Sequence, residues 1–334
     1  MKAAELLEYS EKFKLQVVDI DIPQINSNEV LIKVVAASVN DIDNEIGRGE
    51  LKNIFDYKLP QVLGSEISGH IEKIGDDVKG FDIGDAVYTR LPIRQLGGFA
   101  EYVAVDVDYI AKAPKTLKLF QSSTVPFPAL AAYQILVDRL TVESGKTLFI
   151  NGGSGSFGAG AIVIAKAMGL NVIVSGNRKF RNNAMILGAD KYIDYKVLDY
   201  TQVVDRVDYV IDALGSDHFE DEMKILKTNG DLVSLNGIPD NAFAKRQKFG
   251  WLKKHKIKKM SANVESKSDE HRVKYHYVLS RENGKQLKKI SEIIDKTDCI
   301  KKIKFERGVF KIDQINEALD YVKKHHTEKV IILF

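Results

Sequence analysis

The chain has 334 residues, 44% of them hydrophobic and 28% charged, a composition typical of globular proteins and a length that favours two domains. Its 49 basic and 46 acidic residues leave a net charge of +3, which gives no general argument for a nucleic-acid or membrane partner. The single cysteine, Cys299, excludes an internal disulfide and a zinc site made of several cysteines. No signal peptide or bilayer-spanning run is found, so we expect a cytoplasmic protein with no membrane partner.

Residues 1–110 predict short strands joined by turns. The stretch VLIKVVAASV (30–39) is rich in β-branched side chains, as a buried strand is. The stretch EISGHIEKIG (66–75) alternates between apolar and polar residues and ends at a glycine. Because glycine turns recur here and a helical period is missing, we predict a mainly β domain.

From about residue 122 onward, strands alternate with helices. Strands are predicted at TLFING (147–152), NVIVSG (171–176), KYIDY (191–195), VDYVIDAL (207–214) and DLVSLNGIP (231–239). Helices are predicted between them, at SFGAGAIVIAKAMG (156–169), RNNAMILGAD (181–190) and EDEMKILKTNG (220–230). This alternation is typical of parallel βαβ units and predicts a doubly wound α/β sheet.

The last third of the chain is less regular. Residues 241–274 are basic with an irregular pattern, and VKYHYVLS (273–280) predicts one further strand. The stretches GKQLKKISEIIDK (284–296) and QINEALDYVKK (314–324) have the apolar period of amphipathic helices. The stretch EKVIILF (328–334) predicts a closing strand.

A glycine-rich loop follows the strand at 147–152 and opens a helix. Gly153, Gly155 and Gly158 match the pattern G-x-G-x-x-G, in which the glycines permit a tight turn, close approach of a pyrophosphate and close packing of helix on strand. Such a loop can also be a turn without a ligand. Its place at the first turn of a run of βαβ units favours dinucleotide binding, and the lack of a following Lys-Ser or Lys-Thr excludes a nucleotide-triphosphate loop.

Several long stretches, in this order, resemble the medium-chain dehydrogenase/reductase superfamily in its zinc-free quinone oxidoreductase branch. They are ASVNDID, LGSEISGHIEKIGDDVKGFDIGDAVY, GGFAEYVAV, PALAAYQIL, NGGSGSFGAGAIVIAKAMG, LGADKYIDY and VDYVIDALGS. The resemblance implies a GroES-like β domain, residues 1–122 completed by 283–334, and a Rossmann domain of parallel sheet, residues 123–282. It also implies that 241–274 is a basic helical insertion present in some relatives.

The resemblance further implies that the chain lacks a catalytic zinc. Asn40, Ser65 and Phe127 stand at the positions where zinc-dependent relatives carry Cys, His and Cys. None of them can replace a thiolate or an imidazole, and Glu66, which remains beside them, is one weak ligand. Without the Lewis acid that activates an alcohol, reduction of an electron-poor acceptor is the expected reaction.

The predicted catalytic residues are Asn40, Asp43 and Ser65. Asn40 and Asp43 match the N-x-x-D of quinone reductases, which implies that Asn40 hydrogen-bonds an acceptor oxygen and that Asp43 orients Asn40 or its loop. Both are also common turn residues, which is the alternative interpretation. The tyrosine that the family often has near Glu45 and the threonine that it often has at Ala131 are missing, so the acceptor stays open.

The turn after the second strand of the Rossmann region predicts the cofactor. Enzymes selective for NAD carry an acid there for the ribose 2′-hydroxyl, but this chain has Asn177 and no acid between Gly158 and Asp190. Arg178 and the cations that follow it suit the 2′-phosphate of NADPH, although ordinary surface cations are the alternative. The predicted cofactor-binding residues are Gly153, Ser154, Gly155, Ser156, Phe157, Gly158, Ser175, Gly176, Asn177, Arg178, Tyr195, Ala213, Leu214, Gly215, Asn236 and Gly237.

These observations predict an NADPH-dependent reductase of quinones or α,β-unsaturated carbonyls, with a small-molecule electron acceptor and no metal. An enoyl-thioester reductase of the same superfamily is an alternative, and the resemblance implies a homodimer. A different class of function is RNA binding through the basic stretch KRQKFGWLKKHKIKK (245–259), where aromatic residues stand among the cations. Against this, the stretch also suits a solvated helix face whose aromatic side chains pack inward, so we expect no nucleic-acid partner.

Overall fold

The computed structural model describes residues 1–52, 55, 57–247, 249–297, 308–325 and 328–334, so that Cys299 lies outside the described residues. The chain forms two compact units. Unit 1 comprises residues 1–130 and 281–334, and unit 2 comprises residues 131–280. The domain boundaries predicted from the sequence, at 122/123 and 282/283, stay a proposal, since a compact unit need not coincide with a domain that folds by itself.

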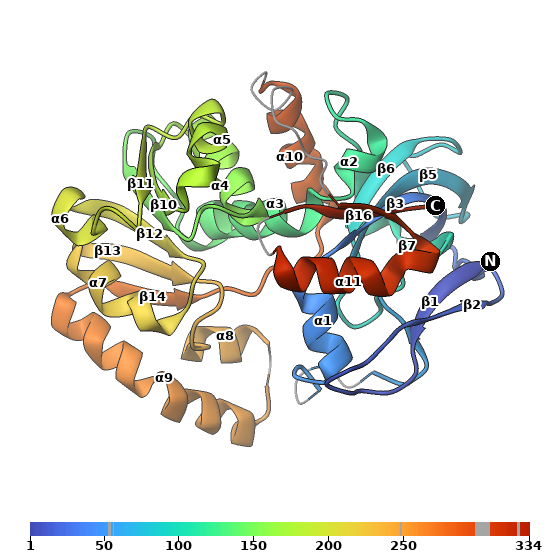
Figure 1. Ribbon diagram of the computed structural model, residues 1–334, viewed down its shortest axis with the longest axis horizontal. Coiled ribbons are helices and arrows are strands. Elements are labelled where there is room, and N and C mark those ends of the chain that lie inside the picture. The colour runs from blue at the N-terminus through green and yellow to red at the C-terminus, as the bar shows by residue number, and fades with distance from the viewer. Residues whose placement is uncertain (53–54, 56, 248, 298–307, 326–327) are drawn as a thin grey trace. The chain divides into compact units, whose positions relative to one another are not determined.

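Unit 1 is built on two sheets (Figure 1). The smaller sheet has the order β2 (Gln16–Asp19), β1 (Lys2–Leu6), β4 (Gln61–Val62). The larger sheet has the order β15 (Gly308–Lys311), β16 (Val330–Leu333), β3 (Glu29–Val39), β5 (Glu66–Ile74), β6 (Ala86–Arg90), β8 (Ile110–Lys112), and β7 (Tyr102–Asp106) also pairs with β3. The helices of this unit are α1 (Asp41–Arg48), α2 (Leu119–Ser122), α10 (Gly284–Asp295) and α11 (Ile315–Lys324).

The carboxyl-terminal segment completes the larger sheet of unit 1. Strand β16 pairs antiparallel with β3, with Ile331 opposite Ser38. Ile331 and its neighbour Ile332 are fully buried, because the strand is covered on both faces. The two ends of the chain therefore share one β core, as the resemblance implies for a GroES-like domain.

Unit 2 is a parallel six-stranded sheet covered by helices. Its order is β11 (Lys191–Asp194), β10 (Asn171–Gly176), β9 (Thr147–Asn151), β12 (Val207–Asp212), β13 (Leu226–Ser234), β14 (Lys274–Tyr277). Counted along the chain this is the order 3-2-1-4-5-6 of the Rossmann fold. Its helices are α4 (Ser156–Ala167), α5 (Arg181–Ile186), α6 (Tyr200–Val203), α7 (Phe219–Lys224), α8 (Asn241–Arg246) and α9 (Trp251–His271), while α3 (Pro126–Tyr133) crosses the boundary between the units.

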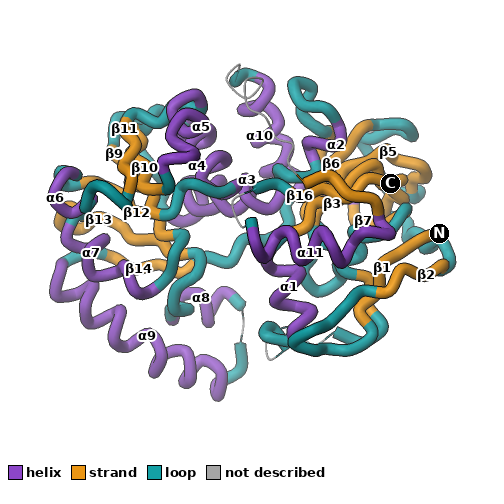
Figure 2. The backbone as a smooth tube through the Cα atoms, in the orientation of Figure 1, coloured by secondary structure: helices purple, strands orange, loops and turns teal. Residues whose placement is uncertain are grey.

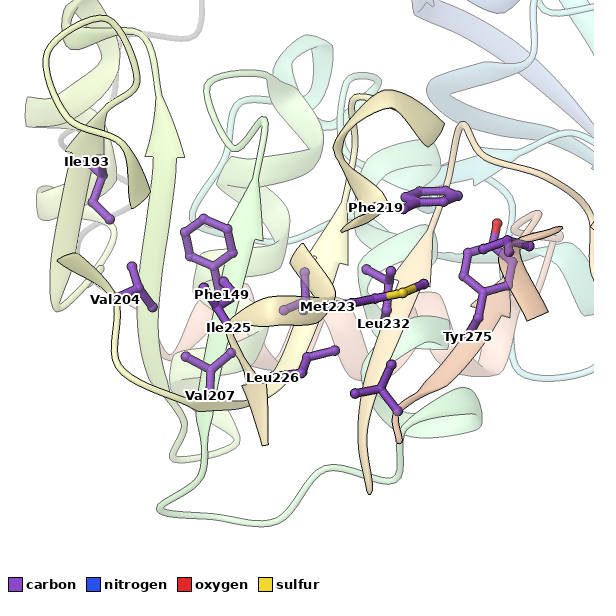
Figure 3. Close-up of a cluster of buried hydrophobic side chains, with 13 residues drawn as sticks. Phe149, Ile193, Val204, Val207, Phe219, Met223, Ile225, Leu226, Leu232 and Tyr275 are labelled. Atoms are coloured by element: carbon purple, nitrogen blue, oxygen red, sulfur yellow. The ribbon is translucent and has the colours of Figure 1, made fainter. Parts of the chain in front are cut away.

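The core of unit 2 explains why the strands are apolar without alternation. Phe149 of β9 and Leu232 of β13 are fully buried against Met223 of α7 and Val264 of α9 (Figure 3). Figure 1 shows α4 and α5 on the opposite side of the same sheet. A sheet covered on both faces buries successive side chains, so the predicted fold class of a GroES-like β domain with a doubly wound Rossmann sheet is confirmed.

The helix predicted over residues 220–230 is wrong in its second half. Helix α7 ends at Lys224, and β13 already begins at Leu226, which pairs with Val207. The adjacent residues Ile225 and Leu226 are both buried. Pairing with β12 therefore overrides the helix propensity of the local sequence. A prediction from one segment sees only that propensity, since the pairing partner lies elsewhere in the chain.

The described residues of segment 241–274, whose pattern alone looked irregular, are mainly helical, as the resemblance implied. The segment contains α8 and the 21-residue helix α9, which lies at the outer side of unit 2 (Figure 2). Residues 251–271 contain no proline or glycine, and lysine is a good helix former. Only Ser261, Val264 and Ser268 of α9 are buried, and two of these three are polar, which explains why an apolar period is missing from the sequence.

None of the helices in the described part of the chain is both long enough and apolar enough to cross a bilayer.

Candidate functional site

The glycine loop of unit 2 joins β9 to α4. Gly152 adopts a φ of +77°, which favours glycine, and Gly155 is the N-cap of α4. No side chain caps this helix, and its first turn carries no acidic residue. The amide groups at the start of α4 are therefore left for an anion, together with the positive end of the helix dipole.

The three glycines of the motif differ in what surrounds them. A Cβ on Gly158 would lie 2.2 Å from the carbonyl oxygen of Gly153, and one on Gly153 would lie 2.4 Å from Val174 Cγ1. By contrast, a Cβ on Gly155 would meet no atom within 4 Å. Two glycines thus allow helix and strand to pack closely, whereas Gly155 borders open space, as a position that a pyrophosphate approaches should.

The end of β10 is tied to the glycine loop by a hydrogen-bond network. The backbone N–H of Asn177 donates to Ser154 Oγ (2.7 Å), and the Tyr192 hydroxyl donates to the carbonyl oxygen of Asn177 (2.7 Å). Gly176 fits between them, since a Cβ there would lie 2.3 Å from Ser154 Oγ. Ser175 is buried within β10. Tyr192 was not predicted as a site residue from the sequence. The only hint in the sequence is that it lies in the same stretch, KYIDY, as Tyr195.

The turn that follows β10 presents cations to solvent. Arg178 and Lys179 are exposed, and Asn177 Oδ1 accepts a hydrogen bond from the Lys179 backbone N–H (3.0 Å). Tyr195, at the end of the neighbouring strand β11, is 56% exposed. Because β10 and β11 are parallel, both ends meet at one edge of the sheet, so Arg178 and Tyr195 can meet one ligand there.

A buried carboxylate holds the loop after β12. Asp212 Oδ1 accepts hydrogen bonds from the backbone N–H groups of Leu214 (2.9 Å) and Gly215 (3.0 Å), and Asp212 Oδ2 accepts one from Ser234 Oγ (2.6 Å). Asn236 Nδ2 donates to the carbonyl oxygen of Ala213 (2.9 Å). Asp212 therefore positions the predicted cofactor loop 213–215, and the side chain of Asn236 ties that loop to the segment that follows β13.

Beneath this loop lies a second buried acid that the sequence did not predict. Asn151 Nδ2 donates to Glu222 Oε1 (2.7 Å), and both residues are buried. Burial first, and the nearby Asp212 second, raise the pKa of Glu222 to about 9. Glu222 is therefore protonated at neutral pH, which avoids two adjacent buried charges.

In unit 1, Asn40 and Asp43 form the start of helix α1. Asn40 is the N-cap in an extended conformation, and its backbone N–H donates to Asp43 Oδ2 (2.8 Å). Asp43 is fully buried. Burial raises the pKa of Asp43 to about 8, the hydrogen bond from Asn40 opposes that rise, and Glu66 adds to it. Asp43 is therefore an uncharged group at neutral pH that holds the backbone of Asn40.

Glu66 joins the predicted residues of this unit. Its Oε1 accepts a hydrogen bond from Asn40 Nδ2 (2.9 Å), and its Oε2 accepts one from the backbone N–H of Phe127 (2.7 Å). Burial raises the pKa of Glu66, while Lys329 and these two hydrogen bonds lower it. The structure thus brings residues 40, 66 and 127 together around one carboxyl group, with Ser65 next in sequence.

Two further polar groups of this cluster, the Ser65 hydroxyl and the Lys329 ammonium, differ in their hydrogen bonding. The hydroxyl of Ser65 is buried and makes no hydrogen bond within the described part of the chain. Lys329, which the sequence did not single out, donates from Nζ to the carbonyl oxygen of Thr124 (2.6 Å). Its ammonium lies deep although part of the residue reaches the surface, and burial lowers the pKa of Lys329 to about 8. The orphaned Ser65 hydroxyl is a group that a bound ligand could satisfy.

This cluster does not suit a zinc ion. It offers an amide, a hydroxyl, a phenyl ring and the carboxyl of Glu66, and none of the three residues at the expected ligand positions supplies the nitrogen or sulfur that zinc prefers. No group of three or more His, Cys, Asp or Glu that could hold a metal occurs among the described residues. Arg90 lies nearby, with its guanidinium 4.6 Å from the centre of the Phe127 ring, so a cation is already present.

Two family models match most of the chain. The alcohol dehydrogenase GroES-like domain matches residues 26–115, and the zinc-binding dehydrogenase model matches residues 187–332. The chain belongs to the medium-chain dehydrogenase/reductase superfamily. A zinc-type alcohol dehydrogenase-like protein of Staphylococcus epidermidis is 31% identical over 72% of this chain and 72% of the relative, and the quinone oxidoreductase of Homo sapiens is 28% identical over 70% and 72%.

Similar proteins include enone reductases and a quinone oxidoreductase. The chain is 28% identical to the 2-methylene-furan-3-one reductase of Solanum lycopersicum, over 99% of this chain and 79% of the relative. It is 28% identical to the chloroplastic NADPH-dependent alkenal/one oxidoreductase of Arabidopsis thaliana, over 94% and 74%. The quinone oxidoreductase structure from Coxiella burnetii is 26% identical with a TM-score of 0.80, and the match covers 100% of this chain and 99% of that one.

Proposed function

We propose that the protein is a zinc-independent, NADPH-dependent reductase of quinones or α,β-unsaturated carbonyls. Two features together support the proposal. The chain has a complete glycine-rich loop for a dinucleotide, and it has Asn40, Ser65 and Phe127 at the positions where zinc-dependent relatives carry their metal ligands. The names of the similar proteins agree with this activity.

Unit 2 suits the binding of NADPH. The amides at the start of α4 would hold the pyrophosphate beside Gly155, and Arg178 would pair with the 2′-phosphate. Bound NADPH supplies the hydride of the reaction. The loop 213–215, held by Asp212, would meet the cofactor through backbone groups.

Unit 1 suits the binding of an acceptor oxygen. Asn40 Nδ2 carries two N–H groups, and Glu66 accepts one of them, so the other remains for an acceptor. Glu66 and Asp43 act as positioning residues, since they fix the side chain and the backbone of Asn40. The Ser65 hydroxyl can donate a second hydrogen bond to the same class of ligand. A carbonyl oxygen gains negative charge during reduction, which such donors stabilise.

We further propose that the protein is a cytoplasmic homodimer. In relatives the Rossmann sheets commonly pair edge to edge, and β14 is one of the two edge strands of this sheet. Light scattering after size-exclusion chromatography would measure twice the chain mass for a dimer, and a mass of 37.4 kDa would contradict it.

The experiment that tests the activity is a screen of NADPH oxidation with quinones, enones and enoyl thioesters, together with alcohol oxidation by NADP. We expect turnover with quinones or enones, and little with alcohols. A preference for enoyl thioesters would assign the alternative reductase activity instead. Alcohol oxidation as the main activity would contradict the proposal.

A further inference from the structure

The first ten residues of α9, 251–260, form a surface that we call the α9 tip. The surrounding stretch 245–259 has eight basic and no acidic residues, whereas the rest of the chain has 41 basic and 46 acidic residues. The small net charge of the whole chain therefore hides a strongly positive segment on a negatively charged remainder. Such a segment attracts an anionic partner.

The α9 tip also exposes large apolar side chains. Trp251 is 75% exposed, Leu252 is 74% exposed and Met260 is 50% exposed. Burial in α9 begins only at Ser261. Of the two aromatic side chains that the sequence analysis expected to pack inward, only Phe249 does so. It packs edge-on against Phe243, with ring centres 6.0 Å apart, while Trp251 is exposed.

Exposed lysines follow Trp251 and Leu252 along the α9 tip. Lys254, Lys256, Lys258 and Lys259 are exposed, and across the described residues no acidic side chain forms an ion pair with them. Their long apolar stems can lie along a nonpolar layer while the ammonium groups reach anionic groups above it. Trp251 and Leu252 are adjacent at the start of the helix, and exposed apolar side chains next to lysines suit the headgroup region of an anionic membrane.

We propose that the α9 tip docks on a bilayer surface that carries anionic phospholipids, with Trp251 and Leu252 inserted at the level of the headgroups. The lysines would contact the lipid phosphates and carboxylates. This contact is peripheral and needs no spanning helix.

A nucleic acid fits the same surface less well. Sequence-independent binding of single strands uses several aromatic faces for base stacking. Here Phe249 is covered by Phe243 and by Lys253, whose Nζ lies 5.2 Å from the ring centre. One face of Trp251 stacks on His255, with ring centres 6.0 Å apart. Leu252 cannot stack on a base, but it gains free energy when a lipid layer buries it.

The test uses Trp251 as its own probe, because it is the single tryptophan of the chain. Purified full-length protein is titrated with phosphatidylcholine vesicles with and without phosphatidylserine. We expect a blue shift of Trp251 emission and co-flotation of the protein with the anionic vesicles only. Added salt should weaken both, because it screens the attraction between lysines and headgroups.

Two pairs of variants separate charge from apolar contact. The double variant Lys254→Glu with Lys258→Glu should weaken vesicle binding by at least about tenfold, since one lysine near an anionic surface contributes roughly fivefold. Its control, Lys285→Glu with Lys288→Glu in unit 1, should bind as the wild type does. Leu252→Ser should weaken binding about fivefold, whereas Val197→Ser, which alters a side chain 73% exposed elsewhere in unit 2, should have no effect.

Three results would overturn the proposal. The first is equal binding to vesicles with and without phosphatidylserine, or to neither. The second is tighter binding to single-stranded RNA than to anionic vesicles, seen when RNA displaces the protein from the vesicles at a concentration below that of the phosphatidylserine present. The third is a blue shift that rises with protein concentration in the absence of vesicles, which would assign the α9 tip to contact with a second copy of the chain.

Discussion

The glycine loop of unit 2 is built from backbone, whereas the cluster around Glu66 in unit 1 is built from buried side chains. The loop depends on where a Cβ is forbidden, at Gly153 and Gly158, and where space is open, at Gly155. The Glu66 cluster depends on hydrogen bonds between residues far apart in the chain, such as Lys329 and Thr124.

This difference predicts different responses to mutation and to pH. Backbone geometry has no titratable group, so the loop should respond to side-chain volume and hardly to pH. The Glu66 cluster contains carboxyl groups and an ammonium with shifted pKa values, so it should respond to charge. The following predictions test this contrast, from the largest expected effect to the smallest.

Gly158→Ala should produce the largest effect. Its Cβ would lie 2.2 Å from the carbonyl oxygen of Gly153, which is backbone and cannot turn aside. We expect the free energy of unfolding to fall by about 3 kcal/mol or more, measured by urea denaturation. The matched variant Gly155→Ala should leave stability nearly unchanged and weaken NADPH binding in a fluorescence titration. Equal losses of stability in the two variants would contradict the different roles of these glycines.

Asp43→Asn should stabilise the protein at neutral pH. The folded-state pKa of Asp43, about 8, lies above its ordinary value of 3.8, so folding favours the protonated form. The stability from this group is present below about pH 4 and is lost as the pH rises towards 8. We expect the substituted amide, which is never charged, to add about 2–3 kcal/mol at pH 7 and to flatten this pH dependence.

The control for Asp43→Asn is Asp41→Asn in the same first turn of α1, where the side chain is exposed. It should change stability by less than about 1 kcal/mol. Urea denaturation between pH 4 and 8 measures both variants. An Asp43→Asn protein that keeps the wild-type slope would show that this carboxyl is ionised when folded.

Asn40→Ala should reduce turnover more than it reduces stability. The variant removes an N–H group proposed for the acceptor and one partner of Glu66. We expect kcat to fall about 10- to 30-fold, or about 1.4–2 kcal/mol, with the Michaelis constant for NADPH unchanged. Asn44→Ala, which removes a buried hydrogen bond to the Leu319 carbonyl, should lower stability and keep kcat. Full turnover of Asn40→Ala with the best acceptors would remove Asn40 from the site.

Arg178→Ala should lower the preference for NADPH over NADH. We expect the wild type to prefer NADPH at least about tenfold in kcat/KM, which corresponds to about 1.4 kcal/mol, and the variant to lose most of that ratio through NADPH. Lys285→Ala, an exposed cation of unit 1, is the control. A wild-type enzyme that uses both cofactors equally would show that the turn after β10 does not recognise the 2′-phosphate of NADPH.

Metal removal should have no effect. Because the Glu66 cluster lacks ligands that suit zinc, incubation with a chelator should leave turnover with quinones or enones unchanged, and added zinc should not raise it. Metal analysis of the purified protein should find zinc well below one ion per chain. Loss of activity on chelation that zinc restores would contradict the metal-independent mechanism.

The segments that sequence predicted correctly are those whose signal is local. Strands β9, β10 and β12 are continuous apolar runs, and the glycine spacing before α4 identifies the loop without reference to distant residues. The second half of the helix predicted at 220–230 was wrong, because the pairing of Leu226 with Val207 joins two strands. The same limit applies to Asp212, whose importance lies in the amides of Leu214 and Gly215 that it holds.

The sequence by itself determined the two kinds of sheet and the position of the glycine-rich loop, because strand periodicity and glycine spacing are properties of short segments, and its resemblance to known proteins identified the superfamily. Only the tertiary structure decided that Glu66 gathers Asn40 and Phe127, that Asp43 is buried and protonated, and that Trp251 lies outside. Burial and pKa depend on what the rest of the chain places around a residue. A local pattern cannot carry that information, and for this reason the role of Lys329, and the exposure of Trp251 and Leu252 within the basic stretch that the sequence singled out, became visible only in the folded protein.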